Sequence, residues 1–302
     1  EIGVRLVGSE MCIRDRDNGE FKGDAISTTS ELVKISSDGN LGLQEGQKFE
    51  RGGIYRFTVD VTKGNTKAVL TVEKVGKVDL PAPDIFFGNS KMEVTDTDIY
   101  KSDQVFTRGQ MITVTGIDNL NEWWIDPDFF EKQSDGTLKF LPINGDYRVT
   151  ANGILKYFSV IALKDGKPAK LQDDGTGAIW AIGKGIGKPS VTSSEVGWET
   201  GKALCLAQVA PKKYQLTLKA GETLKTSGDW EAISFKFFYQ NDWGGEFSNY
   251  ASNTLVEQLK LTGSGNLEMQ DNKAFEEGGV YRFTIDVTNG NANAILKVEK
   301  IN

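Results

Sequence analysis

The feature that most constrains this chain is a phrase that it contains twice. The sequence GGIYRFTVDVTKGN at 52–65 returns almost unchanged as GGVYRFTIDVTNGN at 278–291, 226 positions later. With this offset, residues 20–76 align with residues 246–302 without a gap, and 28 of the 57 pairs are identical. Most of the other pairs exchange one apolar or turn residue for another. The chain therefore contains a duplicated structural module.

The repeated phrase has the two-residue period of a β-strand. In the second copy, apolar and polar side chains alternate, and the alternation resumes after the turn TNGNAN at 288–293. The predicted inward positions are Tyr281, Phe283, Ile285 and Val287, followed by Ala294, Leu296 and Val298. Their equivalents in the first copy are Tyr55, Phe57, Val59 and Val61, followed by Ala68, Leu70 and Val72. Each copy is therefore predicted to end in a half-buried β-hairpin.

Short alternating segments, separated by glycine, asparagine and aspartate turns, continue through most of the remaining chain. The further predicted strands are 110–116, 137–141, 146–150, 155–163, 177–183, 202–209, 213–220, 233–240 and 257–263. No amphipathic segment reaches helical length, apart from a single turn near 126–132. We predict an all-β protein built of tandem immunoglobulin-like β-sandwich modules.

Breaks in the strand pattern set the predicted domain boundaries. Two prolines interrupt the pattern after the first hairpin, and the stretch KDGKPAKLQDDGTG at 164–177 marks a second, softer boundary. We predict half of a repeated module at 17–77, a middle β module at 80–172 and a complete β-sandwich module at 173–302. The alternative is that the middle module forms an integral part of the last one.

The first sixteen residues, EIGVRLVGSEMCIRDR, resemble a translated sequencing-adapter read-through of the kind found at the ends of metagenomic protein fragments. We interpret residues 1–16, which include Cys12, as non-native, and we expect a C-terminal fragment that has lost its targeting signal. The first module would then keep only the closing half of its sandwich. Its inward residues, such as Phe57, would lack a facing sheet and pack poorly.

Composition excludes several classes of function. The net charge is −7 and the pI is near 5.0, which argues against nucleic acid as a partner. The chain has no histidine, so Ser-His-Asp and Cys-His catalysis and histidine-bound zinc are excluded. With Cys12 set aside, only Cys205 remains, and its apolar setting predicts a buried thiol. We expect no enzyme activity, because no motif places a pair of carboxylates across a cleft.

Two polar motifs carry weak signals for ligands. The sequence GKGIGKPS at 183–190 has the glycines of a phosphate-binding loop, but a strand pattern rather than a helix follows it. We therefore predict a plain turn there. Acidic residues at 126–131 and 173–175 could hold a structural calcium, but neither group has the full series of ligands. We expect no cofactor.

Tryptophans are the strongest functional clue. None of the six lies in the duplicated stretch, and Trp180 is predicted to be core because it lies within a strand. Trp198 and Trp243 instead stand among turn residues, where an indole either stacks on a ligand such as a sugar ring or caps the core. Both interpretations stay open. Trp123, Trp124 and Trp230 are further candidate contacts, although we expect at least half of the four aromatics at 121–130 to be core.

The stretch 179–302 resembles the carbohydrate-binding modules of SusE/SusF-like lipoproteins from polysaccharide-utilisation systems. The resemblance lies in the order of elements: IWAIGKGIG, then GW, YQLTLKAG, an FKF strand, W-GG and the closing GGVYRFTIDV hairpin. It implies a glycan-binding site formed by Trp198, Lys236 and Trp243, with no metal. The loop before Trp198 departs from the starch-binding pattern, so the resemblance leaves the identity of the glycan open.

The resemblance also implies a location and partners. Such proteins are cell-surface lipoproteins of the outer membrane that bind starch or another glycan without cleaving it, and a TonB-dependent transporter complex is an expected partner. Two other functions remain open from the sequence. One is a structural immunoglobulin-like spacer or adhesin module, and the other is an accessory module of a polysaccharide-degrading enzyme.

Overall fold

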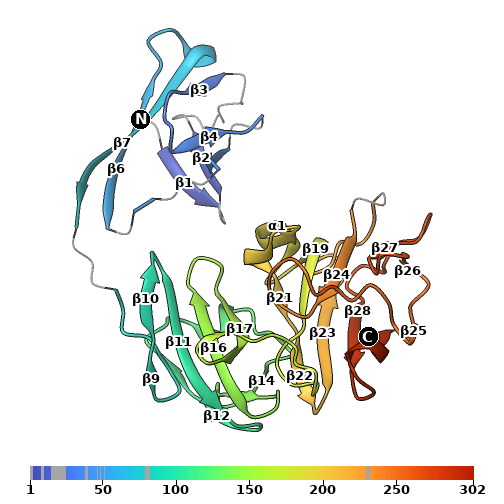
Figure 1. The fold of residues 1–302 in the computed structure, drawn as a ribbon. Helices are drawn as coiled ribbons and strands as arrows, with labels where there is room; N and C mark the ends of the chain where they lie inside the picture. Colours follow the sequence, from blue (N-terminus) through green and yellow to red (C-terminus); the bar gives the residue numbers. More distant parts are fainter. Residues whose placement is uncertain are drawn as a thin grey trace. The chain divides into compact units, whose positions relative to one another are not determined.

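A computed structural model describes residues 3–7, 10–14, 25–37, 40–45, 47, 49–50, 52–78, 82–228 and 232–302. The protein is all-β, with 47% of residues in strands and 6% in helices, as predicted. The chain divides into two compact units, Glu1–Ala82 and Pro83–Asn302 (Figure 1). No helix among the described residues is long and apolar enough to cross a membrane.

The second unit begins with a domain built around one five-stranded antiparallel sheet of order β10-β11-β16-β17-β18. Its strands are β10 (Glu93–Asp96), β11 (Ile99–Phe106), β16 (Gly145–Asn152), β17 (Tyr157–Lys164) and β18 (Lys167–Pro168). Two small sheets accompany it, formed by β12 (Met111–Ile112), β15 (Leu138–Phe140) and β14 (Phe130–Lys132), and by β13 (Val114–Thr115), β8 (Phe86–Phe87) and β9 (Ser90–Lys91). A 3-10 turn, η2 (Leu120–Glu122), precedes β14. Buried phenylalanines fill the space between the sheets, with Phe87 in contact with Phe106, Phe130 and Phe158.

Two sheets form the C-terminal sandwich. One has the order β20-β19-β24-β27-β26, with β21 also paired to β19, and the other has the order β22-β23-β28-β29-β25. The first contains β19 (Trp180–Gly187), β20 (Glu195–Gly197), β21 (Leu204–Cys205), β24 (Ser234–Phe238), β26 (Leu259–Leu261) and β27 (Leu267–Met269). The second contains β22 (Ala207–Ala210), β23 (Lys213–Lys219), β25 (Ser252–Thr254), β28 (Val280–Asp286) and β29 (Ile295–Lys300). The short helical pieces are α1 (Val191–Ser194), η3 (Thr200–Lys202) and η4 (Asn291–Asn293). Phe235 and Phe237 of one sheet meet Phe283 of the other, which forms the core between the two layers.

The predicted closing hairpin of this domain is confirmed. β28 and β29 pair antiparallel, and all seven predicted inward side chains are buried: Tyr281, Phe283, Ile285, Val287, Ala294, Leu296 and Val298. The predictions for Trp180 and Cys205 are also confirmed, because both are buried and the Cys205 thiol is free.

The first unit repeats the same elements at the offset of 226. Its strands are β3 (Ile26–Thr28), β4 (Val33–Ile35), β5 (Leu41–Leu43), β6 (Gly53–Asp60) and β7 (Ala68–Lys77), with the 3-10 turn η1 (Asn65–Lys67) before β7. They correspond in order to β25, β26, β27, β28 and β29. Two further strands, β1 (Gly3–Val7) and β2 (Glu10–Arg14), extend the sheet of β5 and β4.

The expected lack of a facing sheet in the first unit is wrong in part. Phe57 and Val59 of β6 pack against a small cluster that includes Val33 and Leu41 from the neighbouring sheet. These β6 side chains are nevertheless only half-buried, whereas Ala68 and Leu70 of β7 are buried. The first unit therefore has a core, but a much smaller one than the C-terminal domain.

The two domains of the second unit are joined by hydrogen bonds along their boundary. Arg108 Nη1 donates to the carbonyl of Val209 at 2.9 Å, and the indole Nε1–H of Trp180 donates to the carbonyl of Ala169 at 3.0 Å. The backbone N–H of Ile143 donates to the carbonyl of Gln208 at 2.9 Å. These contacts favour the alternative in which the middle module is an integral part of the last one.

Candidate functional site

Trp243 stands on the loop that follows β24. Gly244 and Gly245 adopt φ values of 83° and 69°, which glycine reaches at no steric cost. The backbone N–H of Tyr239 donates to the carbonyl of Gly245 at 2.7 Å and closes the loop. The W-GG sequence thus forms a tight turn that leaves 51% of Trp243 exposed.

Trp198 reaches the same face from a different strand. It directly follows Gly197, which ends β20 and pairs with Gly183 of β19. The Trp198 side chain is half-buried and packs against the core of the domain. Trp198 therefore caps the core, as one of the two interpretations from the sequence has it, and part of its surface remains exposed.

The two tryptophan rings lie beside one another. Their centroids are 6.3 Å apart and their planes are inclined by 26°. The buried Phe238 supports the pair, with its ring 6.0 Å from that of Trp243 and nearly perpendicular to it. Two residues separated by 45 positions in the chain thus form one aromatic surface, called here the tryptophan pair.

Lys236 lies on the same face of the sheet as the tryptophan pair. On β24, the buried Phe235 and Phe237 point into the sandwich, so Lys236 points outward. It pairs across the sheet with Ile182 of β19. The other neighbour of β19 is β20, the strand that leads into Trp198. Lys236 is half-buried, and within the described part of the chain no ion pair or hydrogen bond engages its ammonium group. The structure therefore brings Trp198, Lys236 and Trp243 to one face.

The remaining candidate tryptophans do not join this face. Trp123 is buried and stacked on Phe158 at 4.5 Å, so its ring serves the core. Trp124 is half-buried, and its Nε1–H donates to Glu222 at 2.6 Å across the domain boundary. With the buried Phe129 and Phe130, three of the four aromatics at 121–130 are core, as expected. Trp230 lies outside the described residues.

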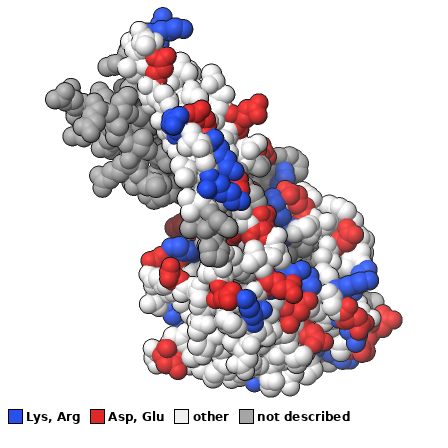
Figure 2. Space-filling view, turned by 90° about the vertical axis from the view of Figure 1, so that its left-hand side faces the viewer, with Lys and Arg blue, Asp and Glu red and all other residues white. Residues whose placement is uncertain are grey.

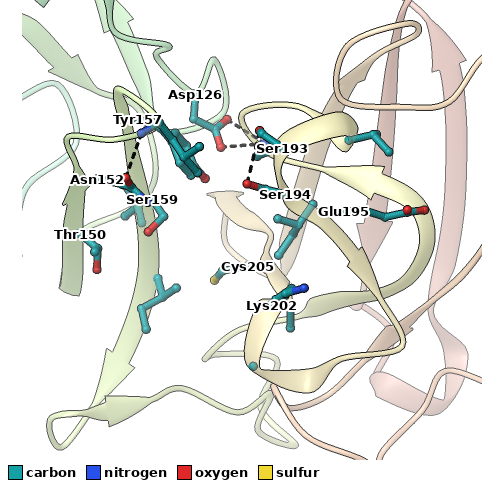
Figure 3. A pocket seen from close by; sticks show the side chains of 18 of the residues that line it. Asp126, Thr150, Asn152, Tyr157, Ser159, Ser193, Ser194, Glu195, Lys202 and Cys205 are labelled. Atoms are coloured by element: carbon teal, nitrogen blue, oxygen red, sulfur yellow. Dashed lines mark hydrogen bonds and ion pairs between the residues drawn. The ribbon is translucent and has the colours of Figure 1, made fainter. Parts of the chain in front are cut away.

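A cleft of about 640 Å³ lies between the two domains of the second unit (Figure 3). Its wall on the middle domain carries Thr150, Asn152, Tyr157 and Ser159 of β16 and β17. Its wall on the C-terminal domain carries Thr192, Ser193, Ser194, Glu195 and Lys202 of α1, β20 and η3. The pairing of β16 with β17 sets Thr150 beside Ser159 and Asn152 beside Tyr157. The cleft thus presents hydroxyl groups on both walls, together with charged and apolar side chains such as Lys202 and Val160.

A cluster of three buried charged residues lies where this cleft meets the domain boundary. Lys188 Nζ donates to Asp126 Oδ1 at 2.9 Å and Oδ2 at 2.7 Å, and to Asp128 Oδ2 at 3.2 Å. The side chains of Lys188, Asp126 and Asp128 are only 1%, 4% and 1% exposed. Lys188 belongs to the C-terminal domain and the two aspartates to the middle domain, so the cluster joins the domains.

Further hydrogen bonds hold Asp128 in place. Its Oδ2 accepts from the backbone N–H of Thr217 at 2.6 Å, and its Oδ1 accepts from the Thr217 hydroxyl at 2.6 Å. Gln215 Nε2 donates to Oδ1 at 2.8 Å. A buried carboxylate is stable only when its oxygens are satisfied in this way.

The two aspartates differ in acidity because their surroundings differ. Burial raises the pKa of Asp126, and the nearby Asp128 adds to this effect against the opposing charge of Lys188. Burial alone would also raise the pKa of Asp128, but Lys188, Gln215 and Thr217 together hold that pKa below its ordinary value. Asp126 is therefore the carboxyl group of the pair that takes up a proton more readily.

Two sequence-based predictions for the segment around Lys188 were wrong. The segment 183–190 is not a plain turn, because β19 continues to Gly187 and Lys188 is buried. A helical turn, α1, then follows in place of a strand, with Ser190 accepting a hydrogen bond from the N–H of Ser193. Asp126 and Asp128, considered for calcium, face an ammonium group instead. No local signal predicts a contact between residues 62 positions apart.

The Cys205 thiol also lines the cleft but is not suited to nucleophilic attack. Burial raises the pKa of the Cys205 thiol to about 12, so it stays protonated at neutral pH and is a poor nucleophile. Within the described residues, no group of three or more histidine, cysteine, aspartate or glutamate side chains is arranged to hold a metal ion.

Comparison with known families gives two matches. The domain of unknown function DUF5121 matches residues 3–62 and 174–288, and the domain of unknown function DUF5125 matches residues 80–171. No curated protein matches the sequence. The two DUF5121 matches end at residues 62 and 288, which differ by the repeat offset of 226, and together they span more than half of the 302 residues. The chain therefore belongs to the DUF5121 family and carries a DUF5125 domain between its two DUF5121 segments.

Proposed function

We propose that the C-terminal domain binds a glycan on the face of the tryptophan pair and does not cleave it. The observation that carries this proposal is the side-by-side, nearly parallel arrangement of Trp198 and Trp243 at the surface. Apolar faces of sugar rings pack against indole, while neighbouring polar groups hold the hydroxyls. Lys236 supplies such a polar group on the same face.

The charge distribution fits a ligand without strong charge. On the face shown in Figure 2, lysine and arginine are interspersed with aspartate and glutamate over the second unit, without one dominant patch. In the C-terminal domain, exposed charges neutralise one another in ion pairs such as Lys260 with Asp271 and Lys273 with Glu257. A neutral polysaccharide is therefore the ligand class that we propose.

The wider biological setting is part of the same proposal. It rests on the resemblance of residues 179–302 to SusE/SusF-like modules. In this setting the protein is a cell-surface lipoprotein of the outer membrane, and it delivers glycan to a TonB-dependent transporter.

Binding is tested with a glycan array probed by the purified chain, followed by titration calorimetry with the best glycan. We expect Trp243→Ala and Trp198→Ala each to weaken binding at least tenfold, because a shallow site has few other contacts to share the loss. Val105→Ala is the matched control, since Val105 is 71% exposed and lies in the other domain. Unchanged affinity in Trp243→Ala would exclude the tryptophan pair as the binding site.

A structural spacer is the second candidate function, and the buried charge cluster at the domain boundary favours it. A spacer needs a rigid junction between domains, whereas a glycan-binding module does not. An array with no bound glycan, together with a single unfolding transition for the whole second unit, would favour the spacer.

A further inference from the structure

The contact between Lys188 and Asp126 has the composition of a reactive pair. A primary amine and a carboxyl group lie within 2.7 Å and 2.9 Å of one another, both nearly excluded from solvent, with a second carboxylate beside them. We propose that the Lys188 and Asp126 side chains condense to an isopeptide bond, which links the DUF5125 domain covalently to the C-terminal domain.

The distances place the amine in reach of the carboxyl carbon. Because Nζ lies within 2.9 Å of both oxygens of Asp126, carboxylate geometry sets its distance from Cγ at about 3 Å, within the range of a near-attack arrangement. Holding the two groups together in this way converts a bimolecular reaction into a unimolecular one, which is worth several orders of magnitude in rate.

Burial makes the charged forms of both groups costly, although Asp126 and Asp128 together hold the pKa of the Lys188 ammonium group above its ordinary value. Lys188 Nζ lies 5.8 Å from the centroid of the Trp124 ring. In a site with little water, an ion pair loses much of its solvation, so transfer of a proton from the ammonium to a carboxylate becomes less costly. The raised pKa of Asp126, caused first by burial, agrees with its serving as the proton acceptor.

Two groups on Asp128 are placed to assist the reaction. Its carboxylate lies 3.2 Å from Lys188 Nζ and can accept a proton from the attacking nitrogen. Its backbone N–H donates to Asp126 Oδ1 at 3.0 Å. This N–H would stabilise the negative charge that forms on Oδ1 when the nitrogen adds to Cγ.

The reaction balances without any added reagent. One ammonium proton passes to Asp126 Oδ2, and the neutral amine attacks Cγ, so that the N–Cγ bond forms. Asp128 takes a second proton from the nitrogen and returns it to Oδ2, and the Cγ–Oδ2 bond breaks. One water leaves, one proton stays on the amide nitrogen, and Asp128 returns to its carboxylate form. Lys188 and Asp126 both line the cleft, which gives the water an exit.

A competing loss of water at Asp126 is excluded by the sequence. Aspartates can cyclise onto the next backbone nitrogen to form a succinimide, but residue 127 is proline, which has no backbone N–H. Loss of water that maps to Asp126 therefore reports on the bond to Lys188. Asp-Gly pairs elsewhere, such as Asp135-Gly136, are distinguished by peptide mapping.

The experiment is intact mass spectrometry of the full-length folded protein, followed by proteolysis and peptide mapping. We expect the mass to be lower than that of the sequence by one water, together with a branched peptide that joins Lys188 to Asp126. Asp126→Ala removes the carboxyl group, and Lys188→Arg keeps a positive charge but lacks the amine. Neither variant should contain the branched peptide.

Asp128→Asn tests the assisting role. It keeps the size of the side chain but cannot accept a proton, so we expect a lower fraction of linked protein at a given time after folding. An equal linked fraction would overturn the role of Asp128 as the base. A folded wild-type protein with separate, unlinked Lys188 and Asp126 peptides would overturn the isopeptide bond itself and leave an ordinary buried ion pair. The experiment does not depend on glycan binding.

Discussion

Two copies of nearly the same hairpin, one in each unit, end with different degrees of burial. The local geometry is the same in both: Gly64 and Gly290 have φ values of 91° and 92°. In each copy, the side chain of the last residue of the first strand accepts a hydrogen bond of 2.8 Å from the N–H two positions later. Yet Phe283 is fully buried, while its counterpart Phe57 is half-buried. The shape of the hairpin is set by its local sequence, whereas its burial depends on the strands around it.

The difference follows from the neighbours of each hairpin. In the C-terminal domain, β28 is an inner strand between β23 and β29, and β24 faces it across the sandwich. In the first unit, β6 pairs only with β7 and stands at the edge of the order β3-β7-β6. Among the described residues of that unit, no strand takes the place of β23. A side chain on an edge strand with a short facing sheet keeps part of its surface in water.

The largest effect is expected from truncating the equivalent phenylalanines. Phe283→Ala should destabilise the second unit by about 3–5 kcal/mol, because it leaves a cavity in a closed core. Phe57→Ala should cost the first unit clearly less, since Phe57 is already partly hydrated. Tryptophan fluorescence in a denaturant titration reports on the second unit alone, because all six tryptophans lie there. Hydrogen–deuterium exchange of β6 peptides reports on the first. Equal losses of stability in the two units would contradict the expected difference between the hairpins.

Ion pairs of the two units differ in burial, as the two hairpins do. Asp128→Ala should destabilise the second unit by about 3–5 kcal/mol, because it removes one partner from a buried cluster. Exposed pairs such as Arg56 with Glu73 in the first unit should matter little. Arg56→Gln is therefore the control, and its unfolding midpoint should stay near that of the wild type. A small loss in Asp128→Ala would show that the cluster does not tie the domains together.

A smaller effect on stability is expected at the tryptophan pair. Trp243→Ala should change the free energy of unfolding by no more than about 0.5 kcal/mol, because half of the side chain is exposed. The first copy offers no equivalent pair, since Trp243 aligns with Asp17 and Lys236 with Glu10 at the offset of 226. We therefore expect glycan protection in hydrogen exchange on the loop at 240–245 and none in the first unit. Protection of the first unit by glycan would contradict this assignment.

The smallest effect concerns pH and the first unit. Hydrogen bonds from Lys74 and Lys77 lower the pKa of Glu50 from 4.5 to about 2. A lowered pKa in the folded state means that this contribution to stability is present above pH 4.5 and is lost as the pH falls toward 2. Glu50→Gln should make the first unit less sensitive to acid over that window. The carboxyl carbon shift of Glu50 in a pH titration by NMR measures this pKa directly. A pKa near 4.5 would contradict the prediction.

Strand β11 shows where prediction from sequence failed within the fold. It is an inner strand of the five-stranded sheet, but its sequence, IYKSDQVF, places Ser102 and Gln104 at inward positions. Gln104 Nε2 donates to Ser102 Oγ and to the carbonyl of Phe87, both at 3.0 Å, so these polar groups are satisfied. The outward Val105 is 71% exposed. Because polar and apolar residues stand on both faces, the two-residue alternation that reveals other strands is absent.

By itself, the sequence determined the features that depend on neighbouring residues. The alternation in the repeated phrase predicts both hairpins, the glycines predict their turns, and the apolar strands predict the burial of Trp180 and Cys205. These features follow from backbone geometry and a period of two, which any short window reveals. The same reasoning identified Trp198, Lys236 and Trp243 as one group only with the help of a family resemblance.

Only the tertiary structure decided which distant groups meet. Lys188 lies 62 positions from Asp126 and reaches it only because two domains pack together. The tryptophan pair forms because the strands leading to Trp198 and Trp243 flank β19. The burial of Phe283, in contrast to Phe57, depends on a neighbouring strand that one copy has and the other lacks among the described residues. Such contacts depend on chain packing over long separations, for which a local pattern carries no signal.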